Sequence, residues 1–244
     1  FKATKNMPDE KMDRLTEDVG GFNNASTWPD YTNYYEVVPS NHLETLLWAE
    51  ADRMVNLNVD EKNFASEREV VKEEYRQGVL APPYGKFFWL LDDLTFQKHP
   101  YRRGVIGDLV QLSAATRADA EKFYRDYYRP DNAVLIVVGD FDKGTLKSNL
   151  EKAFGGWSSS GKVAAKALPS ARSLDRTGVY IVDRPNSAQS VVSVGQVGVD
   201  RMSADYMPVV VMNSILGGAT PDALFATDGG LADAERFAVI DALS

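Results

Sequence analysis

The sequence predicts an α+β fold in which helices pack against an antiparallel-rich sheet. Strand-like and helix-like segments follow one another along the chain, and the strand-like segments include hairpin-like pieces. This order favours an α+β fold over a doubly wound parallel sheet. With 244 residues, 44% of them hydrophobic and 25% charged, the chain has the composition of an ordinary folded protein.

The first predicted elements are a hairpin and a helix. Residues 19–39 begin with a Gly pair and an Asn pair and continue with alternating Thr, Tyr and Val, which predicts a turn followed by two antiparallel strands. A helix is then expected from Ser40 or Asn41 to about Leu57, because leucines recur at helical spacing and Asn41 with Glu44 forms a capping-box pattern.

Three further helices are predicted between residues 66 and 128. Ser66, with Glu69 three residues later, predicts the start of a helix of about three turns that ends at Gly78. An apolar run predicts a helix at about 85–95. Residues 113–128 predict another helix with Ser113 at its cap.

The remaining elements complete the α+β pattern. Residues 132–142 form a continuous β-branched run that is typical of a strand buried on both faces. An amphipathic helix is predicted at 143–157, strands at 177–183 and 189–199, and a helix at 204–218. Residues 158–173 lose this periodicity and gain Ser, Ala and Lys, which indicates a linker.

Charge and composition restrict the possible partners and locations. The formal charge of −8 disfavours a nucleic-acid partner and would attract basic peptides or cations. The absence of cysteine excludes disulfides and thiolate metal ligands. We expect no membrane span, because no stretch approaches 18 consecutive apolar residues, and no signal peptide, because the first residues lack an apolar segment.

The segment 66–77, "SEREVVKEEYRQ", carries two glutamates that a helix would place on one face. Glu67 and Glu74 are seven residues apart, which separates them by roughly 20° around a helix axis. One interpretation is a metal ligand with a supporting carboxylate. The other is a solvated charged face paired with Arg68 and Lys72.

The residues alone do not supply a complete metal site. Zinc sites use nitrogen ligands, and the chain has only two histidines, His42 and His99, neither at a useful spacing. For both, capping or surface roles are favoured over metal binding. The sequence thus contains part of a possible metal site and no complete catalytic group.

Several motifs together resemble the pitrilysin/insulysin family of zinc metallopeptidases, the inverzincins. They occur in the family's order over about residues 1–218 and read "GGFNNAST", "DYTNYYEVVPS", "WAEADRM", "SEREVVKEEYRQ", "HPYRRGVIG", "YYRPDNAVLIVVGDFD" and "MNSILGG". The glutamate motif followed at this distance by "YYRPDNA" is the most specific part of the resemblance.

The resemblance implies a zinc site that this chain contains only in part. In the family an H-x-x-E-H helix supplies two histidine ligands and the general base, and a downstream glutamate completes the site. Glu74 corresponds to that metal-binding glutamate, and Glu67 to an acid that supports the site without binding the metal. The stretch "FKAT" at 1–4 resembles the sequence just after the H-x-x-E-H motif, so we expect the chain to begin directly after it and to lack the general base.

The resemblance also implies a peptide-binding strand and a domain plan. Asn24, Ala25 and Ser26 resemble the edge strand against which the family's peptide substrates lie; an ordinary strand start is the alternative. Residues 1–157 would form a first domain without its opening strand and zinc helix, and 174–244 the start of a second homologous domain. Residues 219–244 do not match the family pattern.

Two functional hypotheses of different classes follow from this resemblance. The first is a zinc-dependent metalloendopeptidase that hydrolyses peptides, present as an incomplete chain that is inactive alone because the zinc-site histidines and base are absent. The alternative is a non-catalytic peptide-binding protein or the partner subunit of a two-chain peptidase; a fold remnant with neither role is a third. The compartment is undetermined, with a lean toward the bacterial periplasm or export.

Overall fold

The computed structural model describes residues 3–96, 98–159, 167–169, 177–186, 190–195 and 198–217. It divides into two compact units. The first unit comprises Phe1–Ser26, Asn33–Lys72 and Asp108–Lys166. The second comprises Thr27–Thr32, Glu73–Gly107 and Ala167–Ser244.

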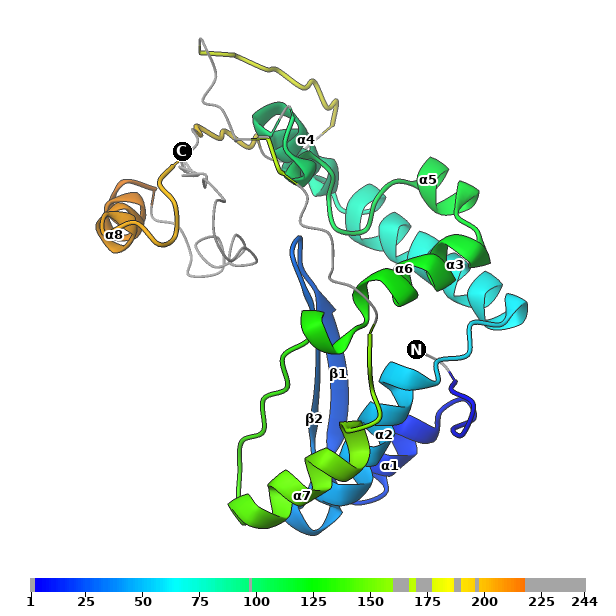
Figure 1. Cartoon of the computed structure of the whole chain (residues 1–244). Coiled ribbons are helices and arrows are strands. Elements are labelled where there is room, and N and C mark those ends of the chain that lie inside the picture. The colour runs from blue at the N-terminus through cyan, green and yellow to red at the C-terminus, as the bar shows by residue number, and fades with distance from the viewer. Residues whose placement is uncertain are drawn as a thin grey trace. The chain divides into compact units, whose positions relative to one another are not determined.

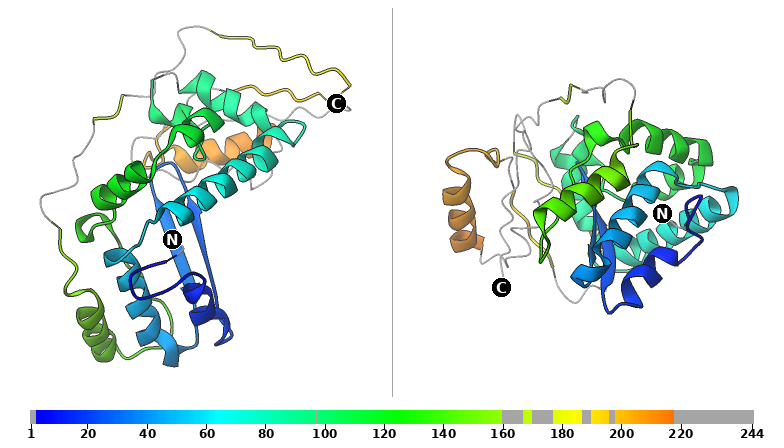
Figure 2. Two further views of the ribbon diagram at one scale, coloured as in Figure 1. Left: turned by 90° about the vertical axis from the view of Figure 1, so that its right-hand side faces the viewer. Right: turned by 60° about the horizontal axis from the view of Figure 1, so that its bottom comes forward.

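The predicted hairpin is present. Strands β1 (Phe22–Thr27) and β2 (Thr32–Val37) form a two-stranded antiparallel sheet. Helices α1 (Lys11–Glu17) and α2 (Leu43–Val55) contact each other and lie near the end of the hairpin away from its turn (Figures 1 and 2). This mixed, helix-rich arrangement confirms the predicted α+β class.

Helix α2 begins later than the sequence predicts. Residues Ser40–His42 form a 3-10 turn, closed by a bond from the His42 N–H to the Pro39 carbonyl at 2.9 Å. The N-cap of α2 is therefore His42, and no side-chain capping bond is present there, so the predicted capping box of Asn41 and Glu44 is wrong. Among the apolar positions predicted for this helix, Leu47 is 3% exposed, whereas Leu43, Leu46, Met54 and Leu57 are half-buried.

Helix α3 (Glu61–Tyr75) is longer than predicted. Asp60 starts it, because its carboxylate accepts a bond from the Asn63 N–H at 2.7 Å and its carbonyl accepts the Phe64 N–H. Ser66, predicted as the cap, therefore lies inside the helix. A wider, π-type turn, Arg76–Leu80, continues the helix past Gly78.

The predicted helix 113–128 is two helices. Asp108 caps α5 (Leu109–Ala114), and Thr116 caps α6 (Arg117–Tyr127) in a capping box with Asp119. Both caps satisfy N–H groups that a helix leaves open at its start. Ser113 lies inside α5 and donates to the Leu109 carbonyl at 2.6 Å, so it is not a cap.

Three other helices agree with the sequence. In the first unit, α7 (Lys143–Phe154) is capped by Asp142 and packs against α2. In the second unit, α4 (Gly85–Thr95) packs against the 3-10 turn Pro100–Arg102. Helix α8 (Tyr206–Gly217) contains Pro208 in its first turn, where a missing N–H is tolerated.

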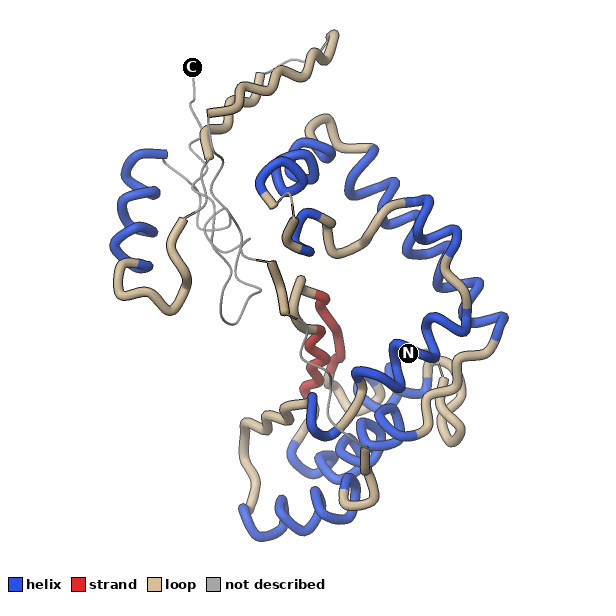
Figure 3. Tube along the Cα trace, turned by 45° about the horizontal axis from the view of Figure 1, so that its top comes forward, coloured by secondary structure: helices blue, strands red, loops and turns tan. Residues whose placement is uncertain are grey.

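The buried strand predicted at 132–142 is not formed. After a 3-10 turn, Pro130–Asn132, the chain runs to α7 as a loop (Figure 3). Val134, Ile136 and Val138 are 87%, 77% and 89% exposed. A strand requires a hydrogen-bonded neighbour, and among the described residues only β1 and β2 form a sheet.

The strands predicted at 177–183 and 189–199 are also absent from their described parts. Residues 177–186, 190–195 and 198–199 form no strand, and Val179 and Ile181 are exposed. The lack of a paired neighbour is again the reason. The predicted linker 158–173 lies mostly outside the described residues, and the tail 219–244 lies entirely outside them, so the proposed domain division remains a prediction.

Helices of the described segments are all too short or too polar to cross a lipid bilayer.

Candidate functional site

Helix α3 carries both predicted site glutamates. Glu67 is half-buried in the middle of the helix, and Glu74 is exposed in its last turn. Because the helix is continuous from Glu61 to Tyr75, their seven-residue spacing places both side chains on one face, as the sequence predicts.

Basic side chains of α3 and of the turn that follows it bond to Glu69, to Glu73 and to a backbone carbonyl. Lys72 Nζ lies 2.9 Å from Glu69 Oε1, and Arg76 Nη1 lies 3.1 Å from Glu73 Oε2. Arg68 donates to the Ala115 carbonyl at 3.2 Å. Exposed pairs of this kind add about 0–1 kcal/mol each. A solvated charged face therefore describes part of the helix, and its ion pairs do not use Glu74.

His99 has a structural role in the second unit. It is 5% exposed and its Nδ1 accepts the Tyr101 N–H at 3.3 Å, which caps the 3-10 turn. Burial lowers the pKa of His99, opposed by the nearby Asp30 charge. The predicted capping role is confirmed, but this histidine is not on the surface. His42 occupies the N-cap position of α2 without a side-chain capping bond.

The described residues do not fit a zinc ion by themselves. They contain no group of three or more His, Cys, Asp or Glu side chains that could hold a metal. Zinc is normally held by four ligands, of which catalytic sites take three from the protein. Glu74 could supply one carboxylate oxygen, so the other ligands would have to come from outside the described residues.

Strand β1 carries the three predicted peptide-binding residues. Asn24 and Ala25 are exposed and Ser26 is half-buried. The Ala25 N–H donates to the Asn24 side-chain carbonyl at 2.8 Å, and the Ser26 hydroxyl bonds across the hairpin to Asn33. The bond from Ala25 satisfies an edge N–H locally, which blunts an open strand edge against non-specific pairing.

Asn23 fixes the beginning of this strand. Its side-chain amide donates to Asp13 Oδ1 at 3.0 Å and to Thr16 Oγ1 at 2.9 Å, both on α1. The exposed residues Asn24 and Ala25 are therefore presented from an anchored strand, as a docking edge for an extended peptide requires.

A buried charged cluster that the sequence did not predict joins the hairpin to α2. Arg53 Nη2 lies 3.1 Å from Glu36 Oε1 on β2 and 2.6 Å from Glu50 Oε2 on α2. Burial and the Glu50 charge raise the pKa of Glu36 to about 8, although Arg53 opposes the shift. The only sequence signal is Glu36, the one charged residue of β2.

A second buried network centres on Asp52 of α2, which is 5% exposed. Its carboxylate accepts bonds from Thr4 Oγ1, from Asn6 Nδ2 at 2.5 Å and from Asn56 Nδ2 at 2.6 Å. Thr4 Oγ1 in turn accepts the Met7 N–H at 2.8 Å.

Backbone bonds strengthen this attachment of the N-terminal segment. Thr4 and Leu57 form an isolated antiparallel bridge. The Lys5 N–H donates to the Asn56 carbonyl at 2.9 Å, and the Asn58 N–H donates to the Ala3 carbonyl at 3.0 Å. Ala3 and Thr4, the described part of the "FKAT" segment that is expected to adjoin the metal-binding motif, are thus fixed to the chain just after α2.

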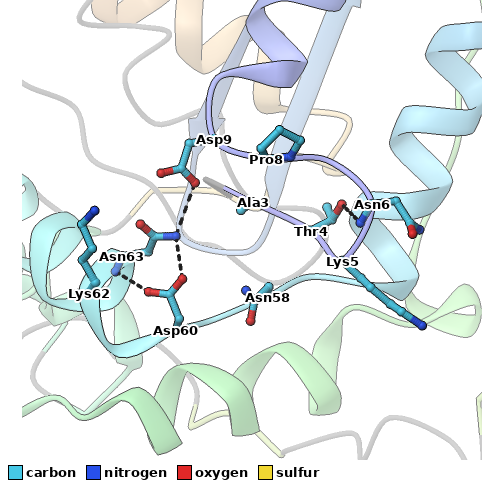
Figure 4. Close-up of a pocket in the computed structure, with 10 residues that line it drawn as sticks. All are labelled: Ala3, Thr4, Lys5, Asn6, Pro8, Asp9, Asn58, Asp60, Lys62 and Asn63. Carbon is cyan, nitrogen blue, oxygen red and sulfur yellow. Dashed lines mark hydrogen bonds between the residues drawn. The ribbon is translucent and has the colours of Figure 1, made fainter.

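An open polar depression lies beside this segment (Figure 4). Within it, Asn63 Nδ2 lies 3.4 Å from Asp9 Oδ1 and 3.0 Å from Asp60 Oδ2. None of the predicted site residues lines it. Its lining residues are Ala3, Thr4, Lys5, Asn6, Pro8, Asp9, Asn58, Asp60, Lys62 and Asn63.

The fold and the motifs around α3 define a peptidase-like α+β protein, and sequence comparisons identify its family. The sequence model "Insulinase (Peptidase family M16)" matches residues 1–108, and "Peptidase M16 inactive domain" matches residues 114–227. The chain belongs to this insulinase family, which confirms the family predicted from the motifs.

Curated relatives include bacterial proteases and a mitochondrial subunit. Zinc protease PqqE of Helicobacter pylori is 36% identical over 140 residues, 57% of this chain and 32% of the relative. Uncharacterized zinc protease YmxG of Bacillus subtilis is 27% identical over 95% of this chain and 56% of the relative. Cytochrome b-c1 complex subunit 1 of Bos taurus is 25% identical over 89% of this chain and 45% of the relative. The chain therefore spans about a third to just over half the length of these relatives.

Solved structures show the same fold. A protease from Helicobacter pylori matches with a TM-score of 0.80 and 25% identity, over 98% of this chain and 60% of that structure. The periplasmic protease PqqL from Escherichia coli matches with a TM-score of 0.70 and 17% identity, over 89% of this chain and 25% of that structure.

Proposed function

We propose that this chain works within a zinc-dependent metalloendopeptidase, with Glu74 as one metal ligand and Glu67 as its supporting acid. The observation that carries the proposal is the match of residues 1–108, which include α3, to the insulinase family. The exposed position of Glu74 at the end of α3 leaves its carboxylate accessible to a metal. When bound, zinc would supply Lewis-acid chemistry for peptide hydrolysis.

In this proposal the two nitrogen ligands and the general base come from outside this chain. His99 is held by Tyr101, and His42 lies at the start of α2, so neither histidine replaces them. Within this chain, β1 would hold an extended peptide substrate through Asn24, Ala25 and Ser26. The 244 residues alone are then expected to be inactive.

The test is a metal-dependent cleavage assay on the protein produced from its complete gene. An unstructured, basic fluorogenic peptide is the substrate, chosen because the chain carries a net charge of −8. Chelation should abolish cleavage, and one equivalent of zinc should restore it. A protein that holds no zinc and cleaves no peptide in this assay would overturn the proposal.

A second candidate is a non-catalytic peptide-binding or partner subunit. It is favoured by the match of residues 114–227 to the inactive domain and by the relative named as a subunit of the cytochrome b-c1 complex. Peptide binding without cleavage, with no zinc retained after purification, would support it over the first. Export to the periplasm is a further proposal, checked by fractionation of the source cells.

Ala25→Pro is predicted to weaken peptide binding by about 10-fold. Proline removes the Ala25 N–H, which in the complex would turn from the Asn24 side chain to a peptide carbonyl. A lost backbone hydrogen bond is worth about 0.5–1.5 kcal/mol, to which the altered strand edge adds. Binding of the same peptide, measured by fluorescence anisotropy, checks the effect. Ala25→Val keeps the N–H and should bind within about threefold of the parent; equal affinities for all three proteins would exclude β1 as the docking strand.

A further inference from the structure

Three charged side chains meet where the hairpin contacts α2. The side chains of Glu36, Glu50 and Arg53 are only 9%, 12% and 10% exposed. One guanidinium nitrogen, Nη2, bonds to both carboxylates, and Glu50 Oε1 is buried with no hydrogen-bond partner among the described residues.

The charges of this cluster do not balance when both acids are ionised. Two buried carboxylates would then face one guanidinium, leaving a net negative charge in a site that water reaches poorly. An uncompensated buried charge is strongly destabilising. A proton on one carboxyl removes the excess charge and creates an O–H donor that the other carboxylate can accept.

The two tyrosines beside the cluster carry no charge that could balance its second carboxylate. The Tyr34 ring lies 4.4 Å from the Arg53 guanidinium carbon, and its hydroxyl lies 2.5 Å from the Tyr128 hydroxyl. Burial raises the pKa of both phenols, so both stay neutral near pH 7. The charge balance of the cluster therefore rests on Glu36, Glu50 and Arg53.

We propose that Glu36 and Glu50 share one proton above Arg53, which makes the attachment of the β1–β2 hairpin to α2 dependent on pH. Glu36 belongs to the hairpin, whereas Glu50 and Arg53 belong to the helix. Loss of the proton places two like charges in the contact between these elements and weakens it. This inference does not depend on zinc binding or on peptidase activity.

The direction in which stability changes with pH follows from the pKa of Glu36 in the folded and in the unfolded chain. In the unfolded chain Glu36 has an ordinary carboxyl pKa near 4.5, and in the folded chain its pKa is about 8. Between these values the folded protein holds a proton that the unfolded chain has released. The stability from this proton is therefore complete below about pH 4.5 and is lost as the pH rises through 8.

Urea unfolding of the full chain between pH 5.5 and 9 tests the proposal, with Glu36→Gln as the variant. In the parent, release of this proton on unfolding should raise the unfolding equilibrium constant by up to about tenfold for each unit by which the pH increases toward 8. Glutamine imitates the protonated acid, so the variant should lose this dependence and exceed the parent in stability near pH 9. Parallel curves for parent and variant would overturn the proposal.

A matched control and a direct proton measurement complete the test. Glu44→Gln changes an exposed glutamate of α2 that is paired with Lys152, and this variant should keep the pH dependence of the parent. Unfolding the parent at pH 7 in weak buffer should release about one proton more than unfolding Glu36→Gln. Equal release would contradict a shared proton. If Glu36→Gln fails to fold, Glu50→Gln serves instead, because the proton belongs to the pair.

Discussion

Glu74→Gln is expected to lower the zinc affinity of the protein from its complete gene by more than about 100-fold, and to abolish peptide cleavage with it. Glutamine keeps the shape of the side chain but removes the negative charge that a zinc ligand contributes. Loss of an outer-shell partner already lowers metal affinity or activity by about 10–100-fold, so loss of a direct ligand should exceed this. Competition with a fluorescent chelator measures the affinity.

Two further variants on α3 test whether the effect is specific to position 74. Glu73→Gln changes the preceding residue, which is exposed and bonded to Arg76 and Gln77, and it should leave zinc affinity unchanged. Glu67→Gln should fall between the two, by about 10–100-fold, if this acid supports the ligand. Equal zinc affinities for parent and Glu74→Gln would remove Glu74 from the metal site and contradict its proposed role as a ligand.

The elements that the sequence predicted well have strong local signals. The hairpin lies between turn-forming residues, and α4 and α7 have continuous helical periodicity. Capping was less predictable, because several polar residues near a helix start compete for the same N–H groups. Asp60 bonds the Asn63 N–H, six residues before the predicted cap Ser66.

The strand predictions failed where they depended on partners. A β-branched run such as 132–142 specifies an extended segment, but only a neighbouring strand makes it part of a sheet. No described segment pairs with it. The sequence shows the strand propensity of Val134 and Ile136, but it does not show which segment would pair with them.

Part of the candidate site could likewise be predicted from local sequence, and part of it could not. Glu67 and Glu74 were predictable because helical geometry fixes their relation once the helix is assigned. The cluster around Arg53 was not, because Glu36 and Arg53 are 17 residues apart and meet only when the hairpin packs against α2. Asp52 is similar: its contact with Thr4 spans 48 residues.

Asp52→Ala is expected to destabilise the protein by about 2–4 kcal/mol and to release the N-terminal segment. The substitution removes the acceptor of three hydrogen bonds at a site that is 5% exposed. A buried donor left without an acceptor costs about 1–3 kcal/mol. The Thr4 hydroxyl bears most of this cost, because the exposed Asn6 can turn toward water.

Urea unfolding measures the loss, and hydrogen exchange of the Lys5 and Asn58 amides reports the released segment, since both amides bond across this contact. Asp52→Asn keeps one acceptor oxygen and should lose about half as much. Asp9→Ala, which removes an exposed carboxylate from the neighbouring depression, should change stability by less than about 0.5 kcal/mol. If Asp52→Ala and Asp9→Ala had equal effects, the Asp52 network would not anchor this segment, and the bridge between Thr4 and Leu57 would have to hold it alone.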